Sequence, residues 1–170
     1  MALLASAVQR DHERPGGGVT WLSFGPVTHH PGSLRVDIRP VADMVADIRD
    51  LPFADETFEG VECWHVLEHL LPWEANVAVR EMARVTRPGG IVEVAVPDLK
   101  ACARLILQGH PAGVRMLYSP HREPEQRHRY GYTAASLGRL LCGHLEQVAF
   151  ASNEGDEYAV HMTGIRKASA

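Results

Sequence analysis

Five short apolar segments constrain the fold of this chain more than any other feature. Each is rich in aliphatic or aromatic residues and is bounded by Gly, Pro or Asp, which is typical of a buried strand. They lie at residues 19–24, 33–38, 43–48, 58–66 and 91–97. Parallel strands covered on both faces are continuously apolar, and helical segments follow the later strands. The pattern therefore predicts an α/β domain with a mostly parallel sheet.

Helical periodicity follows the fourth and fifth of these segments. Apolar residues recur at helical spacing over 73–87, where the Pro-Gly-Gly at 88–90 is expected to end the helix. A second helix is predicted over 98–108, with Asp98 as its N-cap. Both helices would then connect strands of the sheet or cover it.

The last part of the chain changes character. Residues 109–132 are rich in His, Arg, Pro and Gly, and they are predicted to form a long loop. A helix over 133–142 is expected next, with Thr133 as its cap. An antiparallel hairpin made of 145–152 and 157–167 is predicted to close the sheet.

Length and composition predict one soluble domain. The chain has 170 residues, 45% of them hydrophobic and 22% charged, which suffices for an ordinary core. Residues 1–18 are assigned to an N-terminal extension and 19–170 to a single domain. The net charge of −4 argues against a nucleic-acid partner. The apolar stretch near the N-terminus is too short to span a bilayer, so a cytoplasmic protein without a membrane partner is expected.

Turns and polar side chains follow the predicted strands. In open α/β sheets, ligands bind at the carboxyl ends of the strands. The first predicted strand ends at the turn that holds Ser23 and Gly25, and the second ends in Asp37. The third ends in Asp47 and Ile48, and the fourth in Trp64 and His65. We therefore expect one ligand site along this edge of the sheet.

The order of these motifs resembles a known family. The stretches "VDIRP", "ADIRDLPFADETFEGVECWHVLEHL" and "RVTRPGGIVEVAVPDL" are similar to class I S-adenosylmethionine-dependent methyltransferases of the small type-11 kind. "HRYGYTAASLGRLLCGHLEQVAF" resembles the helix before the terminal hairpin in that group. The resemblance extends over residues 19–166. It implies a Rossmann-like, doubly wound α/β fold whose mostly parallel sheet has seven strands, the last of them antiparallel.

The resemblance also implies S-adenosylmethionine as cofactor and a site for it. That site would use Ser23 and Gly25 for the methionine part, Asp37 for the ribose, Asp47 and Ile48 for the adenine, and the backbone near Trp64. The chain departs from the family at the first turn, where Ser23-Phe24-Gly25 stands in place of Gly-x-Gly and a proline follows. The helix that usually joins the first two strands is also missing.

Two histidines are the candidate general bases, because an unperturbed imidazole titrates near neutral pH. His65 follows the fourth strand, and His128 lies in the predicted 109–132 loop. The predicted reaction moves a methyl group to a small-molecule acceptor, with His65 as base and His128 as the alternative base. A homodimer is one arrangement in which a second copy would complete the acceptor pocket.

Two other functions fit parts of the sequence. His65, Glu68 and His69 form H-x-x-E-H, the spacing of inverted zinc proteases, and on a helix both imidazoles would share one face. In the type-11 resemblance this stretch begins the turn after the fourth strand, and no metal ligand is assigned. It also resembles E-x-x-E-H, which holds a divalent ion in the ubiquinone-pathway O-methyltransferases; Glu68 and His69 match that stretch and His65 does not, so a metal-assisted O-methylation is an open alternative. The altered turn at Ser23 favours a different alternative, a methyltransferase-like domain that binds a cofactor or partner without catalysis.

Overall fold

The sheet runs through the centre of the molecule. The computed structural model describes residues 20–26, 30–121, 123–151 and 158–168, so the expected N-terminal extension of residues 1–18 lies outside the described residues. The strands in the described part are β1 (Trp21–Phe24), β2 (Leu34–Asp37), β3 (Met44–Val45), β4 (Phe58–Trp64), β5 (Thr86–Pro97), β6 (Leu145–Phe150) and β7 (Ala159–Arg166). Together they form a seven-stranded sheet.

The order of the strands reverses at β1. The sheet reads β3-β2-β1-β4-β5-β7-β6, with parallel pairing from β3 to β5 and antiparallel pairing of β7 with both β5 and β6. This arrangement confirms the predicted fold class, a mostly parallel doubly wound sheet with the last strand antiparallel. The reversal between β1 and β4 opens the edge where ligands bind in such folds.

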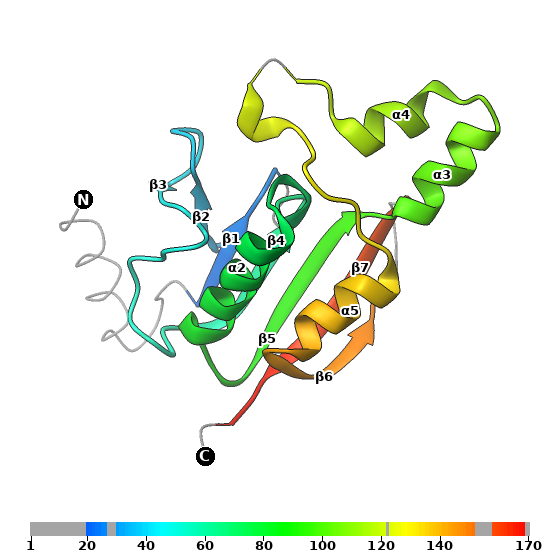
Figure 1. Cartoon of the computed structure of the whole chain (residues 1–170). Coiled ribbons are helices and arrows are strands. Elements are labelled where there is room, and N and C mark those ends of the chain that lie inside the picture. The colour runs from blue at the N-terminus through cyan, green and yellow to red at the C-terminus, as the bar shows by residue number, and fades with distance from the viewer. Residues whose placement is uncertain (1–19, 27–29, 122, 152–157, 169–170) are drawn as a thin grey trace.

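Helices α2 (Pro72–Val85) and α5 (Ala134–Cys142) lie over the same face of the sheet (Figure 1). Helices α3 (Leu99–Leu107) and α4 (Pro111–Tyr118) pack on each other beyond the end of β5. Short 3₁₀ turns, η1 (Leu67–His69) and η2 (Pro124–Gln126), lie on the segments that border the open edge.

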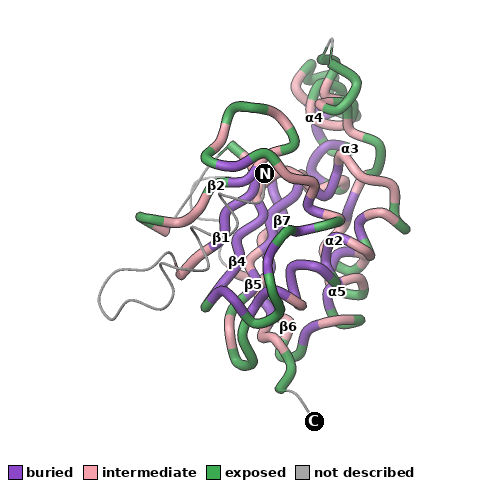
Figure 2. The backbone as a smooth tube through the Cα atoms, turned by 90° about the vertical axis from the view of Figure 1, so that its left-hand side faces the viewer, coloured by how far each residue is buried: buried purple, intermediate pink, exposed green. Residues whose placement is uncertain are grey.

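The core lies between the sheet and the covering helices (Figure 2). Leu22, Val61 and Val92 on three neighbouring strands are fully buried, as are Met82 on α2 and Leu137 on α5. Their apolar side chains provide the main favourable free energy of folding. This packing holds the strand ends in fixed positions.

Two predicted caps are confirmed. The Asp98 side chain accepts a hydrogen bond from the Lys100 backbone at the start of α3. Thr133 and Ser136 bond reciprocally at the start of α5. Each cap satisfies backbone donors that have no partner within the helix.

The structure corrects the expected loop at 109–132. Helix α4 forms within it, because Pro111 suits the first helical position and the His110 ring nitrogen accepts a hydrogen bond from the Ala112 backbone. The first part of the segment therefore belongs to the pair α3–α4. Only the part after Tyr118 returns to the sheet edge (Figure 1).

Two boundaries also differ from the prediction. Helix α2 ends at Val85, and the Pro-Gly-Gly at 88–90 lies within β5 rather than outside it. A Cβ at Gly90 would lie 2.5 Å from the Glu59 carbonyl oxygen, so glycine allows β5 to approach β4 at its irregular start. The predicted strand 43–48 is shorter, because only Met44–Val45 pair with β2.

Candidate functional site

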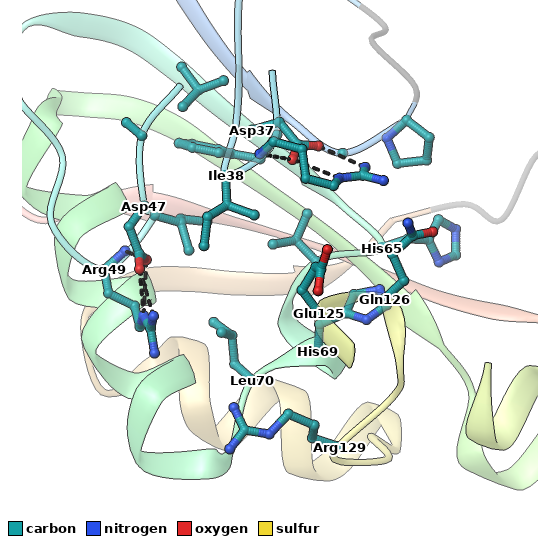
Figure 3. A pocket seen from close by; sticks show the side chains of 18 of the residues that line it. Asp37, Ile38, Asp47, Arg49, His65, His69, Leu70, Glu125, Gln126 and Arg129 are labelled. Carbon is teal, nitrogen blue, oxygen red and sulfur yellow. Dashed lines mark hydrogen bonds and ion pairs between the residues drawn. The ribbon is translucent and has the colours of Figure 1, made fainter. Parts of the chain in front are cut away.

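A pocket of about 460 Å³ lies at the carboxyl ends of β1 to β4 (Figure 3). Of the residues predicted for the cofactor or for catalysis, it brings together Gly25, Asp37, Asp47, Ile48 and His65. The other lining residues are Phe24, Pro26, Val36, Ile38, Arg39, Ala46, Arg49, Val66, His69, Leu70, Pro124, Glu125, Gln126 and Arg129. Its volume is in the range of about 300–1,000 Å³ that small-molecule pockets usually have.

The turn after β1 approaches the end of β4 very closely. Gly25 has a φ of 101°, and a Cβ placed on it would lie 1.8 Å from the Trp64 carbonyl oxygen. Only glycine fits this position, both for its backbone conformation and for space. Ser23 is buried beneath the turn and does not line the pocket.

Trp64 contributes its backbone rather than its ring. The indole Nε1 donates to Glu62 Oε2 at 3.2 Å, and the ring packs against His161 with centroids 4.6 Å apart. Its side chain is not part of the pocket wall. Only the Trp64 backbone carbonyl lies close to the turn, against Gly25, and no part of Trp64 lines the pocket.

Asp37 ends β2 with its carboxylate in the pocket (Figure 3). Arg39 holds it from both sides: the Arg39 backbone N–H and Nε donate to Oδ1 at 2.8 and 3.1 Å, and Nη2 donates to Oδ2 at 3.0 Å. Burial raises the pKa of Asp37, but the Arg39 bonds outweigh it and the pKa is lowered. Asp37 is therefore an ionised acceptor with a fixed orientation.

Asp47 follows β3 and is held in the same way by Arg49, whose Nη2 donates to Oδ2 at 2.6 Å. The Arg49 bonds lower the pKa of Asp47 against the opposing effect of burial. Arg49 also donates to Glu74 at the start of α2, and Glu74 accepts from Arg129 at 2.7 Å. This chain of ion pairs joins the β3 end to the segment that carries η2, so both walls of the pocket are linked.

His65 lies directly after β4 and has a positive φ of 55°. Its backbone N–H donates to the Ala95 carbonyl, and its Nδ1 lies 3.4 Å from Glu68 Oε1. A strained non-glycine backbone at the end of a strand is common at functional sites. Its conformation also overturns the helical interpretation of H-x-x-E-H, because only Leu67–His69 form a turn of 3₁₀ helix and His65 lies outside it.

His69 and His128 lie next to each other and to Glu68, with ring centroids 4.9 Å apart. His69 borders the pocket, whereas His128 lies in a separate small hollow and does not line it. Burial lowers the pKa of His128, and the nearby Glu68 carboxylate offsets part of that effect. Of the two predicted bases, His65 lines the pocket and His128 does not, although Nδ1 of His65 and Nε2 of His128 lie 3.4 and 3.8 Å from the same Glu68 oxygen.

Part of the wall comes from residues 124–129 of the predicted 109–132 loop, where His128 was the one residue predicted for the site and is not among those that line the pocket. Glu125, Gln126 and Arg129 face the strand ends across the pocket (Figure 3), and Pro124 also lines it. Hydrogen bonds from the backbone of Arg129 and Tyr130 to the Glu68 carbonyl hold this segment in place. Arg39 and Arg49 were also missed, although each stands two residues after its aspartate, a spacing that could have indicated the pairs.

The free energy of unfolding is expected to fall below about pH 4. The pKa values of Asp37, Asp47 and Glu81, which pairs with Arg84, are lower in the folded chain than their ordinary values of 3.8 and 4.5. Their stabilising contribution is therefore complete above those ordinary values and is lost as pH falls through the folded pKa values. Urea denaturation at about pH 7, 5 and 3 measures this loss.

An Arg49→Gln variant is the comparison for that pH dependence. Without the guanidinium, the pKa of Asp47 returns towards its ordinary value, so less stability remains to be lost on acidification. A free energy of unfolding that stays constant down to about pH 3 in the unmodified protein would contradict the expectation.

Part of this chain is similar to known methyltransferases. Residues 28–94 match the family model described as a methyltransferase domain. Demethylmenaquinone methyltransferase of Corynebacterium urealyticum is 36% identical over 106 residues, which are 58% of this chain and 43% of the relative. The demethylmenaquinone methyltransferase of Mycobacterium marinum is 46% identical over 52 residues, which are 31% of this chain and 22% of that relative. The matched region thus covers less than half the length of these relatives.

Solved structures share the fold across nearly the whole chain. One is an S-adenosylmethionine-dependent methyltransferase of Thermotoga maritima, described as a possible histamine N-methyltransferase. The match covers 96% of this chain and 89% of that protein, with a TM-score of 0.62 and 14% sequence identity. One from Methanosarcina mazei covers 93%, matches over 97% of its own length, and has the same TM-score and identity. These two structures show that the chain shares the fold of S-adenosylmethionine-dependent methyltransferases, and the family match shows that residues 28–94 are similar to a methyltransferase domain.

Proposed function

We propose that this chain transfers a methyl group from S-adenosylmethionine to a small-molecule acceptor. The observation that carries the proposal is the pocket at the strand ends, where the Asp37 and Asp47 carboxylates and the Gly25 turn converge. These positions match those that the family resemblance implies for the cofactor. The methyltransferase relatives support the same reaction class.

The residues present fit the cofactor chemically. Asp37 keeps acceptor capacity beyond its bonds to Arg39, because an ionised carboxylate has about four acceptor positions. It would accept from the ribose hydroxyls, while Asp47 accepts from the adenine amino group and Ile48 packs on the ring. The Gly25 turn leaves backbone exposed for the methionine part. The pocket volume of about 460 Å³ accommodates a ligand of this size.

S-adenosylmethionine would supply an electrophilic methyl carbon attached to a positively charged sulfur. The remaining work of the protein is to align the acceptor with that carbon and to take up the acceptor's proton. We assign the proton transfer to His65, whose ring lines the pocket at the end of β4. Glu68 lies 3.4 Å from its Nδ1 and would stabilise the imidazolium that forms.

The acceptor would enter beside the apolar part of the wall. Ile38, Val66 and Leu70 line the pocket together with Pro124, so an acceptor with an apolar ring or chain fits better than a highly charged one. The first acceptor to assay is demethylmenaquinone, which the names of the relatives supply. Light scattering of the purified chain would test the expected homodimer.

Calorimetric titration with S-adenosylmethionine and its demethylated product tests the proposed function. We expect both to bind with a micromolar Kd, since the site presents two ionised acceptors in a partly enclosed pocket. Binding without turnover of any acceptor would favour the alternative of a non-catalytic methyltransferase-like domain. No detectable binding of either compound would refute the cofactor site.

Replacing His65 with glutamine is expected to reduce the rate of methyl transfer about 10²- to 10⁴-fold, the usual contribution of a general base. Cofactor affinity should stay within about threefold, because the assigned role concerns the acceptor's proton. His121→Gln, at an exposed position away from the pocket, is the matched control. An unchanged rate in the His65 variant would remove this residue from catalysis.

A further inference from the structure

The Glu68 carboxylate is in an unusual position for a charged group. Its side chain is 2% exposed, and neither oxygen accepts a hydrogen bond within the described part of the chain. A buried carboxylate without hydrogen bonds is costly, so native proteins pair such a group or let it bind a cation. The nearest partners are imidazoles that lie too far away for ordinary hydrogen bonds.

Two of those imidazoles lie at a distance that suits a shared ion. Ligand atoms of Glu68, His69 and His128 all lie within 4.8 Å of one another, and His128 Nε2 is 3.8 Å from Glu68 Oε1. Ligand atoms around a tetrahedral ion bound at 2.0–2.2 Å are roughly 3.3–3.6 Å apart. Small side-chain rotations would therefore bring the three groups to coordination distance.

Backbone contacts fix the orientation of both rings. His69 Nδ1 donates to the Arg127 carbonyl oxygen at 3.2 Å, which leaves its Nε2 for an ion. The imidazole ring of His128 makes a hydrogen bond with the backbone of Met116, and its Nε2 lies 3.8 Å from Glu68 Oε1. The rings stand edge to face, with centroids 4.9 Å apart. Histidine ligands of metals almost always hold their second ring nitrogen in this way.

A small hollow lies beside two of the three side chains, Glu68 and His128. Its volume is about 10 Å³, and Glu68, His128 and Tyr130 form part of its wall. That is about the room that a single water molecule needs. A bound ion could therefore keep one further coordination position for water.

We propose that Glu68, His69 and His128 bind one divalent transition metal ion of the Zn²⁺ type. Two imidazoles and a carboxylate suit such ions, whereas Mg²⁺ and Ca²⁺ prefer sites made of oxygen ligands. His65 lines the pocket and is not part of the ligand set, although its Nδ1 lies 3.4 Å from Glu68 Oε1. The ligand set therefore differs from the H-x-x-E-H pair of the sequence, because His128 replaces His65.

The ion would join two segments that lie far apart in the sequence. Glu68 and His69 belong to the turn after β4, and His128 belongs to the segment whose residues 124–129 form one wall of the pocket. The Arg129 and Tyr130 backbones already bond to the Glu68 carbonyl. Coordination would strengthen that connection and hold the wall in place.

The test is titration of the chelator-treated, full-length protein with Zn²⁺, followed by calorimetry and by competition with a coloured zinc indicator. We expect one equivalent to bind and Tm to rise by several degrees, because the ion binds only the folded chain. Mg²⁺ under the same conditions should have no such effect. Less than half an equivalent of Zn²⁺ bound, or no rise in Tm, would overturn the proposal.

Variants identify the ligands. His69→Gln and His128→Gln should each weaken Zn²⁺ binding at least 10- to 100-fold. Removing a residue that only hydrogen-bonds to a metal ligand already lowers metal affinity by about that much, so removing the ligand itself should lower it at least as far. His121→Gln, in the same part of the chain, should bind as the unmodified protein does. Equal binding by His128→Gln and His121→Gln would overturn the assignment. The stoichiometry of the unmodified protein decides the matter if a variant does not fold.

Co²⁺ distinguishes this site from binding to cysteine. The chain has three free cysteines, one of them the exposed Cys142. A Co²⁺ complex of the proposed ligands has visible absorption bands but lacks the near-ultraviolet band of a cobalt–thiolate bond. Appearance of that thiolate band at one equivalent would place the ion elsewhere and refute the proposal.

Discussion

Replacing Gly25 with alanine is expected to cost roughly 2–6 kcal/mol of folding free energy and to abolish measurable cofactor binding. A positive φ strains a non-glycine residue by about 1–3 kcal/mol, and forcing extra atoms into a packed site costs about 1–3 kcal/mol more. Both apply here, because the φ is 101° and the new Cβ would lie 1.8 Å from the Trp64 carbonyl oxygen. Either the turn or the end of β4 must then move, and both border the pocket.

Gly89→Ala is the matched control for this change. Gly89 also has a positive φ, 78°, but a Cβ there meets nothing within 4 Å. Its replacement should therefore cost only the strain of about 1–3 kcal/mol and leave cofactor affinity unchanged. Urea denaturation and calorimetry on the two variants separate the contributions. Equal losses of stability would mean that the close approach to Trp64 does not constrain the fold.

Replacing Asp37 with alanine is expected to weaken binding of S-adenosylmethionine by tenfold or more. A hydrogen bond to a charged group contributes about 1.5–3 kcal/mol, which corresponds to roughly ten- to 150-fold in Kd. The Arg39 bonds hold the carboxylate in one orientation before any ligand arrives, so little entropy is lost on binding. Calorimetry measures the change directly.

Two further variants make the Asp37 result interpretable. Asp37→Asn keeps the shape and one acceptor oxygen but loses the charge, so its affinity should lie between that of the unmodified protein and that of the alanine variant. Asp50→Ala removes an exposed aspartate that does not line the pocket and should bind normally. Unchanged affinity in Asp37→Ala would take this residue out of the cofactor site.

The positions of Asp37, Asp47 and Ile48 could be predicted from the sequence for a physical reason. Buried parallel strands are recognised by their continuous apolar residues, and the carboxyl ends of such strands meet at one edge of the sheet. The position in the sequence of a residue that follows a recognised strand therefore also predicts its location at this edge of the sheet. The same reasoning placed His65 at the end of β4, where it lines the pocket.

The prediction was wrong where local pattern and tertiary contact disagree. The alternative that placed His65 and His69 on one helical face does not hold, because His65 has a φ of 55° and lies outside the short turn of Leu67–His69, whereas the predicted turn after the fourth strand is present. The 109–132 segment looked irregular by composition, yet α4 forms there, capped by His110 and packed on α3. Composition does not report such packing.

The sequence by itself determined the α/β class, the strand segments and the acids that end them, because periodicity and turn residues act over a few neighbouring positions. Only the tertiary structure decided which distant groups meet. It brought Arg127 to His69 across 58 positions, placed His128 beside Glu68 and closed the pocket with residues 124–129. These contacts depend on how the last segment returns over the sheet edge, and no local pattern in the sequence encodes that path.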